Sequence, residues 1–117
     1  SPALAEQALG PFLAASRNVS PGLIFNAVEA VFNIPRSVLL GRTRTKNIAL
    51  ARQITMYFLK HELRMGLSEV GRYMGGKNHS TVLYAVKRIA ASMSTSPEIR
   101  EKVNSVKEVI TAQARIA

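Results

Sequence analysis

The sequence contains no cysteine, no tryptophan and no aspartate, and its only histidines are His61 and His79. Without cysteine the chain has no disulfide framework, no thiolate metal site and no thiol nucleophile. Without aspartate it cannot build an aspartate-dependent triad, a calcium loop or a kinase catalytic loop. Two histidines far apart in the chain do not suit a dedicated metal site. The composition therefore argues against an enzyme and against a metal cofactor in this chain.

Long hydrophobic runs are also missing. No apolar run reaches the roughly 18 residues that span a bilayer, and no signal peptide is visible at the start. The apolar fraction of 47% is nevertheless enough for a hydrophobic core, and 117 residues correspond to about one domain. Because the chain starts at Ser1 rather than at Met, we expect a fragment of a longer protein.

Positive charge is abundant and unevenly placed. The chain has 16 Lys and Arg against seven Glu, for a net charge of +9. Ten of the bases fall between Arg42 and Arg88, where Glu62 and Glu69 are the only acids. A local excess of this kind is typical of a nucleic-acid-binding surface. A solvated face that serves solubility and a face that meets an anionic membrane remain as alternatives.

Helical periodicity runs through the whole chain, and no segment alternates like a strand. Pro and Gly interrupt the pattern where helices end. We predict an all-α fold, a helical bundle of about six helices without a sheet. A helix at residues 3–15 precedes the bundle, and Ser20, Asn47, Ser68 and Asn78 are expected to start or cap helices within it. The expected bundle helices cover residues 21–32, 36–40, 48–64, 68–74, 78–93 and 97–115.

Three consecutive elements predict a helix-turn-helix: the short helix at 68–74, the Gly75-Gly76 corner and the helix at 78–93. In this motif the second helix presents its N-terminal residues to base edges in the major groove. Those residues are all short hydrogen-bonding side chains that suit bases or phosphates. They also fit simpler roles, as a cap, a surface histidine or first-turn residues. They are Asn78, His79, Ser80 and Thr81.

A second motif, a partial match to a P-loop, does not indicate a nucleotide site. The segment from Gly71 to Lys77 matches the first seven positions of a phosphate-binding P-loop. The eighth position is Asn78, where Ser or Thr is needed to reach the metal, and no strand is expected before Gly71. The chain also has no Asp to help hold magnesium. We therefore reject a nucleotide site at this segment.

Residues 48–89, IALARQITMYFLKHELRMGLSEVGRYMGGKNHSTVLYAVKRI, resemble the C-terminal DNA-binding domain of the bacterial replication initiator DnaA family. The most specific parts are VGRYMGGKNHSTVLYAVKRI (70–89) and Ala51-Arg52-Gln53. The resemblance extends over about 100 of the 117 residues. It implies a Trp-repressor-like helix-turn-helix domain at 20–117, and it makes 1–19 a linker helix or the tail of a preceding ATPase module.

The resemblance implies sequence-specific binding to TTATCCACA-like DnaA boxes at a replication origin, with helix 78–93 in the major groove and the basic loop 42–46 in the minor groove. Base contacts are then expected at Arg44, Asn78, His79 and Ser80. Contacts to the DNA backbone are expected at Arg42, Lys46, Arg52, Gln53, Lys60, Ser68, Lys77, Thr81 and Arg88. Asn78 stands where the family has Asp, and Ser80 where it has Thr. These two changes bear on which bases are preferred.

The family resemblance also sets expectations for partners and cofactors. The chain itself should have no enzymatic activity and no cofactor, since ATP and Mg²⁺ would belong to a separate ATPase module. The expected partners are double-stranded DNA, bound as a monomer on an asymmetric site, the ATPase module of the same parent protein and, as a weak candidate, acidic phospholipid. The expected location is the cytoplasm, in association with the nucleoid. The alternative is a free-standing transcription regulator or mobile-element factor with another target sequence.

Overall fold

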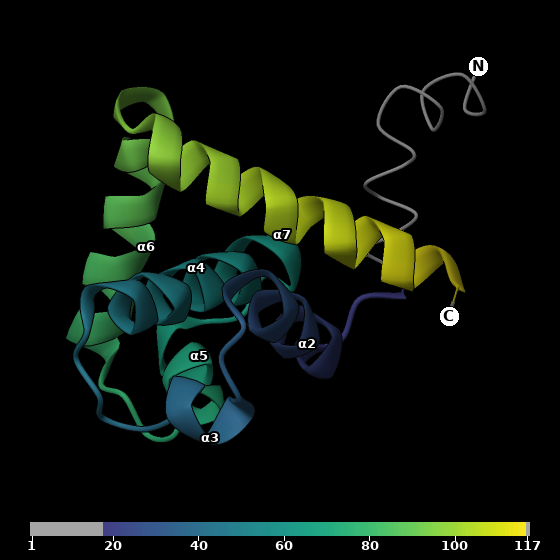
Figure 1. The fold of residues 1–117 in the computed structure, drawn as a ribbon. Helices are drawn as coiled ribbons and strands as arrows, with labels where there is room; N and C mark the ends of the chain where they lie inside the picture. Colours follow the sequence, from purple (N-terminus) through teal and green to yellow (C-terminus); the bar gives the residue numbers. More distant parts are fainter. Residues whose placement is uncertain (1–17, 117) are drawn as a thin grey trace, which may run out of the picture.

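The computed structural model describes residues 18–116, and regular structure in that range is entirely helical (Figure 1). This confirms the predicted all-α fold. The expected helix at 3–15 lies outside the described residues, so the domain division at residue 19 stays a prediction. The helices are α2 (Pro21–Phe32), α3 (Arg36–Leu39), α4 (Lys46–Glu62), α5 (Leu67–Tyr73), α6 (His79–Thr95) and α7 (Pro97–Ile116).

Helix α4 forms the centre of the bundle and packs against α2, α3, α5 and α6. Apolar residues recur along it at helical spacing, and Ile54, Phe58 and Leu59 are almost completely buried. Helix α7 lies across α2 and packs against α6 (Figure 1). It covers the bundle with a single buried stripe, at intervals of three or four residues, formed by Ile99, Val103, Val106, Ile110 and Ala114.

Two of the expected helix caps are confirmed. The Ser20 hydroxyl accepts a hydrogen bond from the Leu23 N–H at 3.2 Å, and Pro21 occupies the first helical position. The Asn78 side chain accepts from the Thr81 N–H at 2.9 Å and so caps α6. These bonds satisfy backbone donors that have no partner inside the helix.

The other two predicted helix starts, at Asn47 and Ser68, are wrong. Asn47 is the second residue of α4, whose cap position is Thr45, and Ser68 is the second residue of α5, which begins after Gly66. Neither cap position makes a side-chain hydrogen bond. A cap contributes only about 1 kcal/mol. Burial of the apolar residues that follow outweighs it here, because Leu50 in α4 and Val70 in α5 are in the core.

The corner between α5 and α6 depends on three glycines. The Gly76 and Lys77 N–H groups both donate to the Gly71 carbonyl at 3.0 Å, which folds the turn back onto α5. A Cβ on Gly71 would lie 2.1 Å from the Lys77 carbonyl oxygen, so a side chain does not fit there. Gly75 and Gly76 have φ values of +82° and +91°, which L-residues rarely adopt. The predicted glycine corner is confirmed, and it sets the direction of α6 relative to α5.

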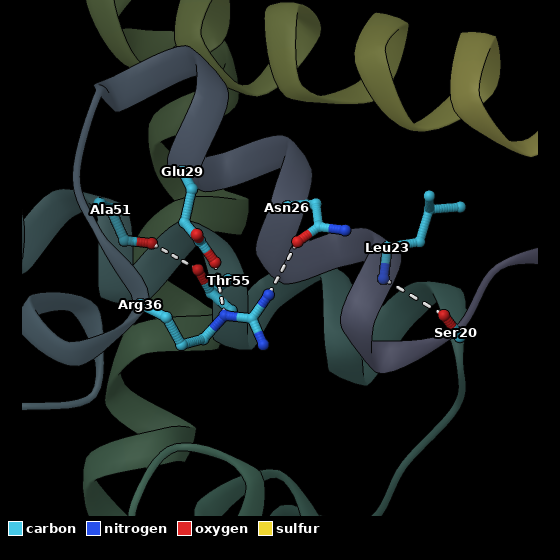
Figure 2. A network of polar contacts seen from close by, with 7 residues as sticks. All are labelled: Ser20, Leu23, Asn26, Glu29, Arg36, Ala51 and Thr55. Carbon is cyan, nitrogen blue, oxygen red and sulfur yellow. Dashed lines mark hydrogen bonds and ion pairs between the residues drawn. The ribbon is translucent and has the colours of Figure 1, made fainter.

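An arginine joins α2 to α3. Figure 2 shows Arg36, the first residue of α3, reaching toward α2, where its guanidinium pairs with Glu29 and donates to the Asn26 side-chain oxygen at 2.8 Å. The same guanidinium lies 4.7 Å from the centre of the Phe25 ring. Asn33, with φ of 55°, ends α2 in the left-handed conformation. The contacts of Arg36 therefore tie the start of α3 to α2, and Glu29 neutralises the cation.

Candidate nucleic-acid interface

The first turn of α6 is exposed and polar. His79, Ser80 and Thr81 are all exposed, while Val82 and Ala85 behind them are buried. Asn78 uses its side-chain oxygen for the cap, which leaves the amide nitrogen as a hydrogen-bond donor. The structure thus gives Asn78 its simpler role as a cap and still presents its amide group at the surface.

A residue missed by the sequence analysis lies one turn further along α6. Tyr84 is 65% exposed, and it follows Ser80 by four residues and Thr81 by three, so the three side chains share one face of the helix. Leu83 beside it is 37% exposed. The signal was present in the sequence, because Val82, Val86 and Ile89 mark the buried stripe and Tyr84 falls on the opposite side.

The basic loop runs from Gly41 to Thr45, between α3 and α4, and has no helical or strand structure. Arg42, Thr43, Arg44 and Thr45 are all exposed. The two arginines thus extend from an irregular loop that lies near the start of α6. This matches the expectation of a basic loop at 42–46, except that Lys46 already belongs to α4.

Arg52, on α4, lies behind this loop and is only 8% exposed. Its guanidinium donates three hydrogen bonds, two of 2.8 Å to the Leu39 and Val38 carbonyls and one to the Thr43 carbonyl. Desolvation by burial lowers the pKa of Arg52 from its ordinary value. An arginine stays protonated under such a shift, so its charge remains.

The loop, α4 and the start of α6 enclose a pocket of about 410 Å³. Four of the residues that line it are cations and none is an acid. Burial, and then the charges of Arg52 and Arg42, lower the pKa of Lys77 below that of an ordinary lysine. The pocket therefore concentrates positive charge without compensation. Its lining consists of Gly41, Arg42, Arg44, Ala49, Arg52, Gln53, Met56, Lys77 and Thr81.

The remaining expected contacts lie around this pocket at different distances. Arg88 donates to the Gln53 side chain and, with Lys46, lines a second pocket of about 160 Å³. Lys60 lies further along α4, roughly 16 Å beyond Ala49 at 1.5 Å per residue. Ser68 is exposed near the start of α5. Lys60 and Ser68 line neither pocket.

Other kinds of site find no support in residues 18–116. The described residues contain no group of three or more His, Asp or Glu that could hold a metal ion. None of the helices described is long and apolar enough to cross a membrane. Gly71, the first residue of the apparent P-loop, lies inside α5, and the part of the chain described before it contains no strand.

A short helix, a glycine corner and a second helix with an exposed polar first turn, next to a pocket lined by cations, define a helix-turn-helix DNA-binding domain. Residues 21–89 match the family described as the bacterial DnaA protein helix-turn-helix. The chain belongs to this DnaA family, of which it carries the C-terminal domain.

Full-length relatives agree with this assignment. The chain is 34% identical over 115 residues to the chromosomal replication initiator protein DnaA of Thermomicrobium roseum, which covers 97% of this chain and 25% of that protein. It is 36% identical over 95 residues to the DnaA of Herminiimonas arsenicoxydans, covering 81% and 21%. The DnaA of Roseiflexus castenholzii is 34% identical over 92 residues, covering 79% and 19%. The chain thus spans a quarter or less of the length of these relatives.

Proposed function

We propose that this chain binds double-stranded DNA sequence-specifically, at DnaA-box-like sites of a replication origin, as the DNA-binding domain of a replication initiator. The observation that carries the proposal is the pocket with Arg42, Arg44, Arg52 and Lys77 on its walls and no acid. A cation cluster with no acid in the lining of its pocket suits a polyanion. The protein family supports DNA as that polyanion.

In this proposal α6 enters the major groove. His79, Ser80 and the Asn78 amide contact base edges, because they are exposed at the N-terminal end of the helix. The Asn78 amide can donate to a base acceptor, which the Asp of the family cannot do. Ser80 lacks the methyl group with which Thr touches a thymine methyl. Any departure of the preferred site from TTATCCACA should therefore lie opposite these two residues.

The basic loop enters the adjacent minor groove through Arg44. An arginine is favoured in a narrow A·T-rich minor groove because the negative potential is enhanced there. Arg44 is exposed and lies on the same pocket as Thr81 from the first turn of α6. One domain can therefore address two grooves of one asymmetric site, which supports binding as a monomer.

The other cations contact phosphates. Arg42 and Lys77 line the pocket, while Lys46 and Arg88 lie beyond it on a second pocket whose lining also contains Glu98. With about six phosphate contacts, the observed affinity should fall with salt at a log–log slope of roughly −5. The proposed contacts to the DNA backbone also include neutral or more distant residues, namely Gln53, Lys60, Ser68 and Thr81.

A fluorescence-anisotropy titration at about 150 mM salt tests the proposal. A duplex that contains TTATCCACA is compared with a scrambled duplex of the same composition. We expect at least hundredfold tighter binding to the box, and we expect Arg44→Ala and His79→Ala each to remove about 1–3 kcal/mol of that preference. Arg115→Ala is the matched control, because it removes one exposed charge from the far end of α7.

Equal, weak binding to both duplexes would contradict the box assignment. Site selection from random DNA then separates two cases. A new consensus that differs opposite Asn78 and Ser80 would show that these two residues have changed the target. The absence of any consensus would indicate a non-specific basic module.

A further inference from the structure

The basic loop has few ties of its own to the rest of the domain. At its start the Gly41 N–H donates to the Val38 carbonyl at 3.1 Å, and at its end the Ala49 N–H donates to the Thr45 carbonyl at 2.9 Å. The midpoint of the loop is Thr43, which lies between Arg42 and Arg44. Its carbonyl accepts a hydrogen bond from the Arg52 guanidinium. Arg52 therefore holds the backbone of the residue next to Arg44.

Arg52 joins this midpoint to the end of α3. Its Nε and Nη2 donate to the carbonyls of Leu39 and Val38, both at 2.8 Å. A guanidinium is planar and rigid, so three bonds from one group fix the relative positions of their acceptors. Three of its five N–H donors point at protein carbonyls, and the residue is 8% exposed. Little of this guanidinium is left for a phosphate to contact.

The turn of the helix-turn-helix approaches the same segment from the other side. The Lys77 Nζ lies 3.5 Å from the Gly41 carbonyl oxygen. Gly75 lies so close to Leu40 that a Cβ would be 3.0 Å from the Leu40 carbonyl oxygen. The loop is thus held between α4 and the turn that starts α6. This arrangement connects the basic loop, which carries Arg44, to the start of α6.

We propose that Arg52 is a positioning residue, which holds the basic loop so that Arg44 reaches the minor groove while α6 occupies the major groove. The proposal rests on the proposed function, and it revises the DNA-backbone contact that the family resemblance implies for Arg52. Arg52 supports discrimination between sequences through Arg44, and it does not act chiefly as a phosphate contact. The carbonyl partners leave its charge uncompensated, so the pocket stays positive.

The variant Arg52→Lys separates the two roles, because lysine keeps the charge but lacks the planar donor group. We expect box affinity to fall at least tenfold, affinity for scrambled DNA to stay within about twofold, and the salt slope to stay unchanged. In the Arg44→Ala background, Arg52→Lys should cost less than about twofold more, because both changes remove the same contact. Arg115→Lys, the same change at an exposed position at the far end of α7, is the matched control and should leave the affinity for both duplexes within about twofold.

Two results would overturn this role. The first is an equal loss of affinity for box and scrambled DNA, which a phosphate contact would give. The second is a double variant whose losses multiply, which would show that Arg52 and Arg44 act independently.

A measurement without DNA keeps this inference separate from the box assignment. In free wild-type protein, the Arg52 Nε–H should exchange with water at least tenfold more slowly than the Arg42 Nε–H, as followed by ¹⁵N NMR. Backbone ¹⁵N relaxation at residues 42–45 should report increased motion in Arg52→Lys, while α7 stays unchanged. Exchange equal to that of Arg42 would refute the positioning role, even if Arg52→Lys fails to fold. Failure of the box titration alone would refute only the proposed function.

Discussion

Arg36 and Arg52 hold opposite ends of α3, and they do so with different partners. Arg36 starts α3 and is paired with the Glu29 carboxylate, with further contacts to Asn26 and Phe25. Arg52 binds the carbonyls at the end of α3 and in the basic loop, and no acid lines its pocket. A carboxylate neutralises the cation, whereas a carbonyl dipole stabilises it and leaves the net charge in place.

The difference separates a structural region from a binding region. At the α2–α3 junction an ion pair gives a modest local gain and lowers the field around it. In the pocket, Arg42, Arg52 and Lys77 repel one another, and the pKa of Lys77 is lowered partly for that reason. Repulsion between these cations thus destabilises the free domain at the place where an anion would bind. Four substitutions test this comparison, in order of decreasing effect.

Gly71→Ala should have the largest effect on stability, because the new side chain would push the turn before α6 away from α5. The new Cβ would lie 2.1 Å from the Lys77 carbonyl oxygen, which forces the backbone to move. We expect the free energy of unfolding, measured by urea denaturation, to fall by about 3 kcal/mol or more. Gly66→Ala is the control, since nothing lies within 4 Å of its Cβ position, and it should cost less than about 1 kcal/mol. Equal losses for both variants would contradict the close approach at Gly71.

The glycine corner is also an example of what could be predicted from the sequence. Gly75-Gly76, Ser20-Pro21 and Asn78 act on backbone groups within about four positions, so a local pattern is enough to find them. The buried stripes of α4, α6 and α7 follow from the same periodicity. Helix starts at Asn47 and Ser68 were wrong because a capping preference is weak compared with burial of the core.

The partners of Arg52 could not be predicted in this way. They lie 9 to 14 residues away in the sequence, and a charged residue on a helix is ordinarily expected to face solvent. Only the packing of α3 against α4 brings the carbonyls to the guanidinium. The pocket depends on the same long-range packing. Candidate DNA contacts in the first turn of α6 followed from the helix-turn-helix pattern, and the other contacts came from a family resemblance. The roles of all of them at the DNA stay predictions.

Gln53→Glu places a carboxylate beside the cations of the binding region and so makes it more like the α2–α3 junction. The Gln53 side chain lines the pocket and already accepts a hydrogen bond from Arg88. We expect box binding to weaken about tenfold, or about 1.4 kcal/mol. The salt slope should become less steep by about one, because one cation is then neutralised internally. Asn104→Asp, the same chemical change on the exposed side of α7, is the control. Similar slopes for both variants would place the DNA elsewhere.

Arg36→Ala tests the structural region. Its loss leaves Glu29 without its ion-pair partner, and Asn26 loses a hydrogen bond. Because Arg36 is 41% exposed, solvent screening limits the effect, and we expect the unfolding free energy to fall by about 1 kcal/mol. The Kd for the box, measured where the variant is fully folded, should stay within about twofold of wild type. A selective loss of box binding would mean that the α2–α3 junction also positions the basic loop.

Lys77→Met should have the smallest effect on stability. The sign of the change in unfolding free energy shows whether the charge of Lys77 destabilises the free domain. The lowered pKa of Lys77 means that the charged form is disfavoured in the folded state, by burial and by Arg52 and Arg42. Below that lowered pKa, the charged Lys77 side chain reduces the free energy of unfolding by its full amount. Between the lowered pKa and the ordinary lysine pKa, the unfolded state binds more protons than the folded state, so the free energy of unfolding rises with pH and the loss disappears. We therefore expect Lys77→Met to stabilise the free domain at pH 7 by about 0.5 kcal/mol, and this gain should vanish near pH 10.5.

The same variant should weaken DNA binding and reduce the salt slope by about one, because a phosphate partner is lost. Lys87→Met, an exposed lysine of α6 outside the pocket, is the control for stability. Urea denaturation at pH 7 and at higher pH measures the difference between the two variants. If Lys77→Met were less stable than wild type at pH 7, the 3.5 Å contact between Nζ and the Gly41 carbonyl would outweigh the repulsion. The charge of Lys77 would then not destabilise the free domain, and the comparison between the two regions would fail.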